Sequence, residues 1–236
     1  MKAVEEFIAQ FKGKTIGIAL NDLETGKEFY VNSDVMMHPA STMKVPVMME
    51  VFRQAEAGLL SLDDRLEIYN SFISIADGSL FMLDETDDSE LTLYRRIGES
   101  ETIHELTRLM IVRSSNLASN LLMDKVTTAQ VNAIVKEYGI ENMSIIRELE
   151  DKKALSLNMN NAACARSSTQ MLTLIADGKA ISQKACDEMI RILLGQEFNE
   201  SIPTLLPPDV KVAHKTGWSG EFFHDTAIVY SQNRKP

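Results

Sequence analysis

A serine and a lysine three positions apart are the first residues whose types and spacing could do chemistry. Ser41 and Lys44 lie at the start of a segment, residues 43–57, that is apolar on nearly every side and is followed by Gly58. Residues three apart on a helix share a face, so the Lys44 amine can reach the Ser41 hydroxyl. Serine is a weak nucleophile until a base takes its proton, and burial lowers the pKa of a lysine because water no longer stabilises the ammonium. The pair indicates a nucleophile and its base, with a helix cap and a surface lysine as the structural alternative.

A second polar cluster, formed by Ser114 and Asn116, falls at the junction between two expected helices. In the structural interpretation, Ser115 caps the second of these helices. In the functional interpretation, Ser114 passes a proton to a leaving group, and Asn116 donates and accepts hydrogen bonds with a substrate amide. Taken alone, the cluster favours the structural interpretation.

A third motif, Lys215-Thr216-Gly217, closes the expected strand at 210–214. Its structural interpretation is an ordinary strand end with a turn glycine. In the functional interpretation, Lys215 is a second cation that binds a carboxylate with help from Thr216 and keeps the first lysine neutral. Gly217 lets the backbone approach a ligand closely. The backbone amide of Trp218 would then pair with that of Ser41 as an oxyanion hole.

Apolar periodicity predicts the elements that would position these residues. Residues 4–11 have the spacing of an amphipathic helix ending at Gly13, and residues 15–20 and 27–31 are expected to be strands. Further helices are expected at 43–57, 116–125, 128–138, 168–177 and 182–194, and further strands at 210–214 and 226–230, separated by the glycines of 217–220.

The stretch between the buried helix and the Ser114 motif is more irregular. Residues 70–100 are acidic, and we expect a solvated loop, because the acidic run at 84–88 lacks the ligand spacing of a metal site. Thr102 and Glu105 then form a capping box that opens a helix through Val112.

Strands at both ends of the chain with helices between them predict an α+β fold. The simplest arrangement is one antiparallel sheet flanked by helices, with an inserted all-helical domain. The expected sheet domain comprises residues 1–38 plus 208–236, and the expected helical domain comprises residues 39–207. The two junctions are places where clefts form.

Composition excludes several classes of function. The chain has 236 residues and a net charge of −10, which makes a nucleic-acid partner improbable. No run approaches the roughly 18 apolar residues of a membrane helix, and the acidic start does not resemble a signal peptide. Cys164 and Cys186 are expected to be buried free thiols. Four scattered histidines and two isolated cysteines provide no ligand cluster for a metal, and no cofactor is expected.

The three motifs occur in the order found in the penicillin-recognising serine enzymes, and the chain most closely resembles the class A β-lactamases. The resemblance covers almost the whole chain and implies the β-lactamase/transpeptidase-like fold. It implies that Ser41 attacks a β-lactam or related amide to form an acyl-enzyme, with Lys44 as the base, directly or through water. By the same resemblance, Ser114 passes the proton to the departing nitrogen, while Lys215 and Thr216 hold the substrate carboxylate.

The loop that supplies the deacylating base in class A enzymes departs from their pattern. Glu150 falls where the family's glutamate is expected, with Glu148 and Asp151 as rivals. Ala154 stands where the family has a partner asparagine. Asparagines do follow at positions 158, 160 and 161, so a different arrangement of the loop stays open.

Two further departures concern charged groups. Ser115 replaces the aspartate that β-lactamases usually carry in the second motif, which removes a structural carboxylate. No arginine follows Lys215 until Arg234, and His224 is a candidate to stand in for the family's carboxylate-binding arginine, with a structural histidine at a strand start as the alternative.

Family members continue beyond the strand that matches 226–230 into another strand and a C-terminal helix. This chain stops at Pro236, so we expect a truncated form or an incomplete product, with a gap in the sheet and the first helix without its partner.

The leading functional prediction is a class A β-lactamase-like serine hydrolase, a penicillin-binding enzyme of the kind that confers antibiotic resistance. A D-alanyl-D-alanine peptidase and a non-hydrolysing β-lactam or peptidoglycan sensor are the alternatives. The resemblance implies a secreted or periplasmic location, whereas the lack of an export signal leaves a cytoplasmic one open.

Overall fold

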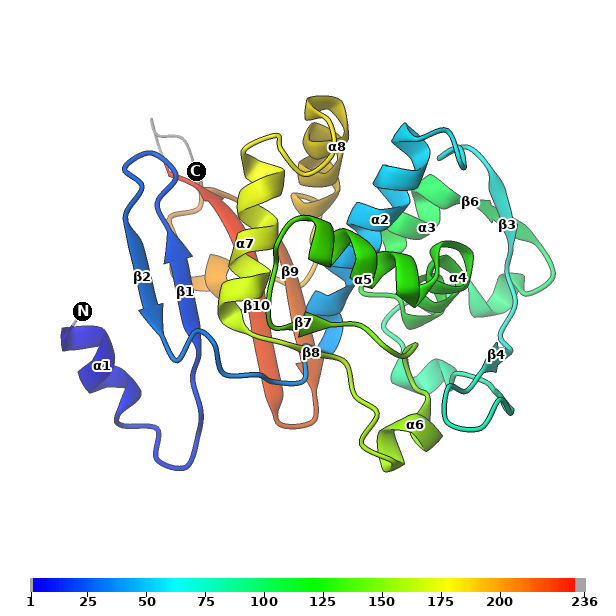
Figure 1. Ribbon diagram of the computed structural model, residues 1–236, viewed down its shortest axis with the longest axis horizontal. Coiled ribbons are helices and arrows are strands. Elements are labelled where there is room, and N and C mark those ends of the chain that lie inside the picture. The colour runs from blue at the N-terminus through cyan, green and yellow to red at the C-terminus, as the bar shows by residue number, and fades with distance from the viewer. Residues whose placement is uncertain (1, 232–236) are drawn as a thin grey trace.

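The computed structural model describes residues 2–231, and it places helices around two β-hairpins (Figure 1). The N-terminal hairpin pairs β1 (Ile18–Asn21) with β2 (Glu28–Val31). The C-terminal hairpin pairs β9 (Lys211–Ser219) with β10 (Phe222–Tyr230) in an antiparallel register that sets Lys215 opposite Thr226. The α+β fold class is confirmed.

The helices are α1 (Lys2–Ile8), α2 (Lys44–Glu56), α3 (Ile103–Val112), α4 (Asn116–Val126), α5 (Thr128–Glu137), α6 (Lys152–Ser156), α7 (Ala165–Ala176) and α8 (Gln183–Leu193). Short strand pairs join β3 (Arg65–Glu67) to β6 (Ser100–Thr102), β4 (Phe72–Ile73) to β5 (Leu80–Phe81), and β7 (Met143–Ser144) to β8 (Ala162–Ala163). The 3₁₀ turns are η1 (Ala40–Met43), η2 (Glu85–Asp87), η3 (Tyr94–Arg96) and η4 (Ile202–Leu205).

Helix α2 is the central element of the helical region. Every residue from Lys44 to Phe52 is buried, as the nearly uniform apolar pattern predicts. Helices α3, α4, α5 and α8 all pack against α2, so the lysine at its first position is enclosed by neighbouring elements. The predicted buried helix is therefore confirmed, with the difference that its first turn is the separate 3₁₀ turn η1.

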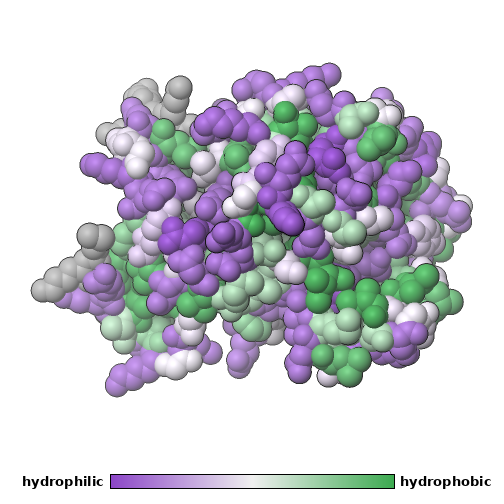
Figure 2. Space-filling view, in the orientation of Figure 1, coloured by the Kyte–Doolittle hydropathy of each residue, from purple (hydrophilic) through white to green (hydrophobic). Residues whose placement is uncertain are grey.

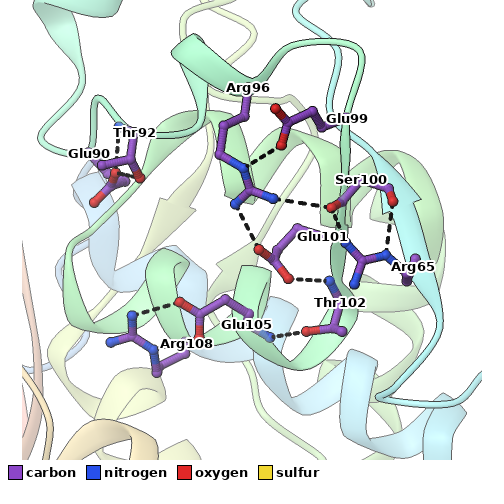
Figure 3. A network of polar contacts seen from close by, with 10 residues as sticks. All are labelled: Arg65, Glu90, Thr92, Arg96, Glu99, Ser100, Glu101, Thr102, Glu105 and Arg108. Carbon is purple, nitrogen blue, oxygen red and sulfur yellow. Dashed lines mark hydrogen bonds and ion pairs between the residues drawn. The ribbon is translucent and has the colours of Figure 1, made fainter.

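Helix α3 begins with half of the expected capping box. The Thr102 side chain accepts a hydrogen bond from the Glu105 amide at 3.1 Å. The Glu105 carboxylate does not reach back, because it pairs with Arg108, and the Thr102 amide donates instead to Glu101 at 2.8 Å (Figure 3). The helix is confirmed, and the reciprocal half of the box is wrong.

The four strands from the two ends of the chain do not form one continuous sheet within residues 2–231. They make two separate two-stranded sheets, and a cavity of about 750 Å³ is lined by residues of both β1 and β10. Helix α7 packs against both β1 and β10 and so connects the two hairpins (Figure 1). Strand β9 runs through Gly217 as far as Ser219, so only Gly220 and Glu221 lie between the two long strands, and the expected break at 217–220 is shorter than predicted.

The acidic stretch before α3 is only partly solvated, which corrects the prediction of a solvated loop. Asp88 is 9% exposed and Glu90 is 0% exposed, because both carboxylates receive hydrogen bonds from the chain around Ser114. Residues 72–73 and 80–81 form the small β4–β5 hairpin. Figure 2 shows apolar residues gathered on the surface over this hairpin and α6, where Leu80 and Leu157 are exposed.

Helix α1 exposes its apolar face. The Phe7 and Phe11 rings contact each other in a T-shaped arrangement, edge to face, and both are exposed. Both cysteines are free and buried, which confirms that prediction. Among residues 2–231, no helix has the length and apolar character needed to cross a membrane.

Candidate active site

The candidate nucleophile, Ser41, sits in η1 directly before α2. Strand β9 runs alongside this turn, so the third motif lies next to the first. A Cβ added to Gly217 would lie 3.0 Å from the Ser41 nitrogen and 3.1 Å from both the Pro39 oxygen and the Thr42 nitrogen. Only glycine lets β9 approach the turn this closely. The geometry therefore places the amide of Ser41 beside the backbone that leads to Trp218.

The amine of Lys44 is completely buried and turned toward the second motif. It donates to the backbone oxygen of Ser114 at 2.6 Å and to Asn116 Oδ1 at 2.9 Å, and it lies 3.3 Å from Ser114 Oγ. Within the described residues, none of its hydrogen bonds goes to Ser41. Burial lowers the pKa of Lys44 to about 7, against the opposing effect of the Asp88 and Glu150 charges. A neutral amine, able to accept a proton, is therefore well populated near neutral pH.

Lys215 reaches the second motif from the other side. Its amine donates to Ser114 Oγ at 3.0 Å and to the Thr216 oxygen at 2.8 Å, and the residue is completely buried. Burial, and then the neighbouring Lys44 charge, lower the pKa of Lys215 well below its usual value, whereas Asp225 opposes the shift. The structure thus brings the three predicted motifs into one hydrogen-bonded cluster.

Asn116 connects this cluster to the loop acids. While its side-chain oxygen accepts from Lys44, its nitrogen donates to Glu150 Oε1 at 2.9 Å. The second oxygen of Glu150 accepts from the Asp84 amide at 3.1 Å. Burial is the largest cause of a raised pKa at Glu150, although the hydrogen bond from Asn116 opposes it. A carboxylate of increased basicity therefore lies one side chain away from Lys44.

The two rival acids lie elsewhere. Asp151 caps α6 by accepting from the Ala154 amide at 3.0 Å, and it also accepts from the Ser74 hydroxyl at 2.8 Å. Glu148 faces Asp124, and burial followed by that neighbour raises the pKa of Glu148 to about 9. Neither side chain has a hydrogen bond to the motif residues within the described chain, so Glu150 is the loop acid that joins the cluster.

The histidines have structural partners. His224 donates to the His38 backbone oxygen at 2.8 Å, and its ring stacks on Phe222. His214, next to Lys215 in the chain, is buried with Nδ1 2.9 Å from Asp225 Oδ1. His104 pairs with Glu188.

Asn161 was expected only as one of three asparagines in the loop, and Asp88 lies in the acidic run; the sequence assigned neither a specific role, yet both bind backbone amides next to the site. Asn161 Oδ1 accepts from the amides of Ile146 and Arg147 at 2.8 and 3.0 Å, which fixes the loop that leads to Glu150. Asp88 accepts from the Asn116 amide at 2.9 Å. Neither had a local signal, because an asparagine or aspartate that bonds backbone amides far along the chain looks like any polar loop residue.

The comparisons with known proteins agree with this geometry. The sequence profile of the beta-lactamase enzyme family (Beta-lactamase2) matches residues 1–236, the whole chain. The chain belongs to the beta-lactamase enzyme family. Among curated relatives of this beta-lactamase-family protein are the beta-lactamases CTX-M-97 and Toho-1 of Escherichia coli. Each is 25% identical over 246 residues, a match that covers 98% of this chain and 76% of the relative.

Solved structures give the same family fold. A beta-lactamase from Sphaerobacter thermophilus matches with a TM-score of 0.82 at 26% identity, covering 98% of this chain and 83% of that one. A beta-lactamase from Chitinophaga pinensis matches with a TM-score of 0.83 at 25% identity, covering 97% and 84%. The predicted resemblance is confirmed by the family profile and the curated relatives. An ancestral class A beta-lactamase shares the fold, with a TM-score of 0.83 at 22% identity and coverage of 99% of this chain and 86% of that one.

Proposed function

We propose that this family member is a serine hydrolase that is acylated at Ser41 by β-lactams or related amides. The observation that carries the proposal is the Lys44 amine, which is fully buried and has a pKa lowered to about 7 beside Ser114. A lysine in that state serves as a base at neutral pH. Lys44 is the first residue of α2 and follows directly after η1, the turn that contains Ser41.

In the acylation step, the Ser41 oxygen forms a bond to the substrate carbonyl carbon. Its proton passes to the neutral Lys44 amine, directly or through a water molecule. The C–N bond of the amide then breaks, and the departing nitrogen takes a proton from Ser114, which Lys44 replenishes through their contact at 3.3 Å. The amides of Ser41 and Trp218 stabilise the oxyanion, an effect worth about 10²–10³ in rate for each donor.

The substrate carboxylate binds at Lys215 and Thr216. Lys215 lies in the middle of β9, and its ammonium form supplies positive charge beside the Ser114 hydroxyl. His224 is not proposed as a carboxylate ligand, because its Nε2 is already used on the His38 oxygen. The substrate class that fits Lys215 and Thr216 is a small amide that carries a carboxylate.

In the deacylation step, Glu150 takes a proton from a water molecule that attacks the ester carbon. The bond between that carbon and the Ser41 oxygen then breaks, and the proton taken by Glu150 returns to the Ser41 oxygen, through Lys44 or water, to restore the hydroxyl. The raised pKa of Glu150 makes this carboxylate a stronger base than an exposed glutamate. Its bond to Asn116 keeps it on the same side of the cluster as Lys44.

A second candidate is a β-lactam or peptidoglycan sensor that stays acylated. The specific observation in its favour is that both Glu150 oxygens already accept protein hydrogen bonds, from Asn116 and from the Asp84 amide. Those bonds compete with the water that the carboxylate would have to activate. A D-alanyl-D-alanine peptidase would share the acylation step and differ in substrate. By family membership, we further propose that the substrate is met outside the cytoplasmic membrane.

The experiment that tests the proposal is intact-protein mass spectrometry over time after mixing with benzylpenicillin, with Ser41→Ala in parallel. We expect an adduct of the mass of penicillin that forms and decays in the wild type and is absent from the variant. A lasting adduct would replace the hydrolase with the sensor. No adduct on the folded wild type, or an adduct on Ser41→Ala, would contradict acylation at Ser41 by this substrate.

A further inference from the structure

The carboxylate of Asp88 is buried against the first turn of α4. Its Oδ2 accepts from the Asn116 and Leu117 amides at 2.9 Å each, and from the Tyr94 hydroxyl at 3.1 Å. Oδ2 also lies 3.4 Å from the Ser115 hydroxyl, which itself caps the helix by accepting from the Ala118 amide at 3.1 Å. The backbone amides at the start of α4 have no partner within the helix. They donate instead to two side chains, those of Ser115 and of Asp88, which lies 28 positions before Asn116.

The two residues after Asp88 hold the other end of the same motif. The Ser89 hydroxyl donates to the Arg113 oxygen at 2.6 Å, and the Arg113 guanidinium donates to Glu90 at 2.7 Å. Glu90 is completely buried and is held in turn by Thr92 (Figure 3). Residues 88–90 therefore form hydrogen bonds with the residues on both sides of Ser114, Arg113 and Asn116.

The turn at Ser114, which these hydrogen bonds stabilise, has an unusual backbone conformation. Ser114 has a φ of +55°, a left-handed conformation that is unfavourable for most residues other than glycine. That conformation lets both its backbone oxygen and its hydroxyl face Lys44. Such a backbone persists only where its surroundings over-determine it, and the bonds from residues 88–90 do so.

Asp88 also acts on the site through its charge. The charges that act on the pKa of Lys44 are those of Asp88 and Glu150, and the Lys44 charge in turn lowers the pKa of the second lysine, Lys215. The negative charge of Asp88 favours the ammonium form of Lys44 and opposes the effect of burial. Removing that charge would therefore lower the pKa of Lys44 further.

We propose that Asp88 is a positioning residue of the acylation site, whose carboxylate holds Ser114 and Asn116 in place from a separate loop. Ser115 replaces the aspartate expected in the second motif, and Asp88 supplies a buried carboxylate at the start of α4 in its place. The inference rests on the proposed function only for its catalytic consequence, since the effect on the turn itself is independent of the substrate.

The test compares Asp88→Asn with Asp87→Asn, the same change one position earlier, where the carboxylate is exposed and pairs with Lys152. Both Asp88 oxygens accept hydrogen bonds, so the side-chain nitrogen of an asparagine at position 88 would face an N–H or O–H donor and could not bond to it. The turn at Ser114 should therefore loosen. We expect the acylation rate constant with benzylpenicillin to fall about 10-fold to 100-fold in Asp88→Asn, and to change less than about 2-fold in Asp87→Asn.

Two further readouts separate positioning from general loss of structure. The acidic midpoint of the acylation rate against pH should move to lower pH in Asp88→Asn, because Lys44 loses a stabilising anion. Hydrogen exchange of the Asn116 and Leu117 amides should speed up in Asp88→Asn and stay unchanged in Asp87→Asn. An unshifted midpoint together with unchanged exchange would overturn the proposal.

The two failures are distinguishable. If benzylpenicillin does not acylate the wild type, the proposed function fails for that substrate, and exchange at Asn116 and Leu117 still decides the role of Asp88. If Asp88→Asn does not fold, Asp88→Glu decides, because it keeps the charge and displaces the carboxylate. That variant should show faster exchange at the two amides and an unshifted pH midpoint, and exchange as slow as in the wild type would overturn the proposal.

Discussion

The Lys44 and Lys215 amines converge on one oxygen, the Ser114 hydroxyl, at 3.3 and 3.0 Å. A hydroxyl oxygen has two lone pairs, so with both lysines charged it accepts from both, and its own hydrogen is left for a third group. When Lys44 is neutral, the same hydrogen can instead point to the amine lone pair. The pair of lysines thereby determines the direction in which Ser114 passes its proton.

Replacing the proposed base should remove acylation without exposing the core. Lys44→Met keeps the length of the side chain in the buried first turn of α2, but it has no group that accepts a proton. We expect the acylation rate constant to fall about 10²–10⁴-fold, the range for loss of a general base. Lys152→Met, at an exposed position, is the control and should acylate normally. A Lys44→Met enzyme within tenfold of the wild type would remove Lys44 from the mechanism.

The acylation rate should rise with pH through neutrality. The active form of Lys44 is the neutral amine, and its pKa is lowered to about 7, so that form grows from pH 6 to pH 8. Lys215 also loses its charge at a pH below the usual lysine range, because burial and the Lys44 charge lower its pKa, and a falling limb should report the loss of the charge that holds the substrate carboxylate. Stopped-flow acylation in buffers of constant ionic strength measures both limbs. Lys215→Arg should retain the acidic limb and lose the alkaline one, and a flat profile between pH 6 and 8 would contradict Lys44 as the base.

Glu150→Gln should separate the two chemical steps. The amide cannot take a proton from water, so deacylation should slow by about 10²–10⁴-fold while acylation persists, and the adduct should accumulate in intact mass spectra. The matched control is Glu148→Gln, two positions earlier. Burial raises the pKa of Glu148 to about 9, so it is already protonated at neutral pH, and the amide should leave the decay of the adduct unchanged. Accumulation in the control and not in Glu150→Gln would transfer the role to Glu148.

A methyl group at Gly217 should disturb the nucleophile. The added Cβ would meet the Ser41 nitrogen at 3.0 Å, which forces η1 and β9 apart. We expect Gly217→Ala to lose about 1–3 kcal/mol of stability and about 10² in acylation rate, as for loss of an oxyanion donor. Thermal melting and acylation kinetics measure the two effects. Ser219→Ala, at the exposed end of the same strand, should show neither, and a normally acylating Gly217→Ala would mean that the close approach is unimportant.

Much of the site was predictable because its residues lie on strongly patterned elements. The uniform apolar pattern around α2 placed Lys44 inside, and it is 0% exposed. The order of the three motifs along the chain then indicated which loop and which strand would meet it. These inferences depend on local burial and on motif order, both of which a single sequence contains.

The parts that escaped prediction depend on partners far along the chain. Asp88 lies in an acidic run that looks like a solvated surface, and only the fold brings the start of α4 to it. Glu150 was predicted only by the family resemblance, because Glu148 and Glu150 are two positions apart on an irregular loop, where no periodicity tells which one faces Asn116. The separation of the two hairpins was missed for a related reason, since strand patterns indicate strands and not their neighbours.

The cavity between β1 and β10 also affects which part of the molecule unfolds locally. Within residues 2–231, no sheet pairing joins the N-terminal hairpin to the C-terminal one, and packing on α7 is what connects them. Segments with few hydrogen bonds to their surroundings open at a lower free energy than the core does. Ser41, Lys44 and Lys215 do not line that cavity. The hairpin of β1 and β2 is therefore expected to be a unit that opens on its own, while the part of the chain that holds the three motifs stays folded around α2.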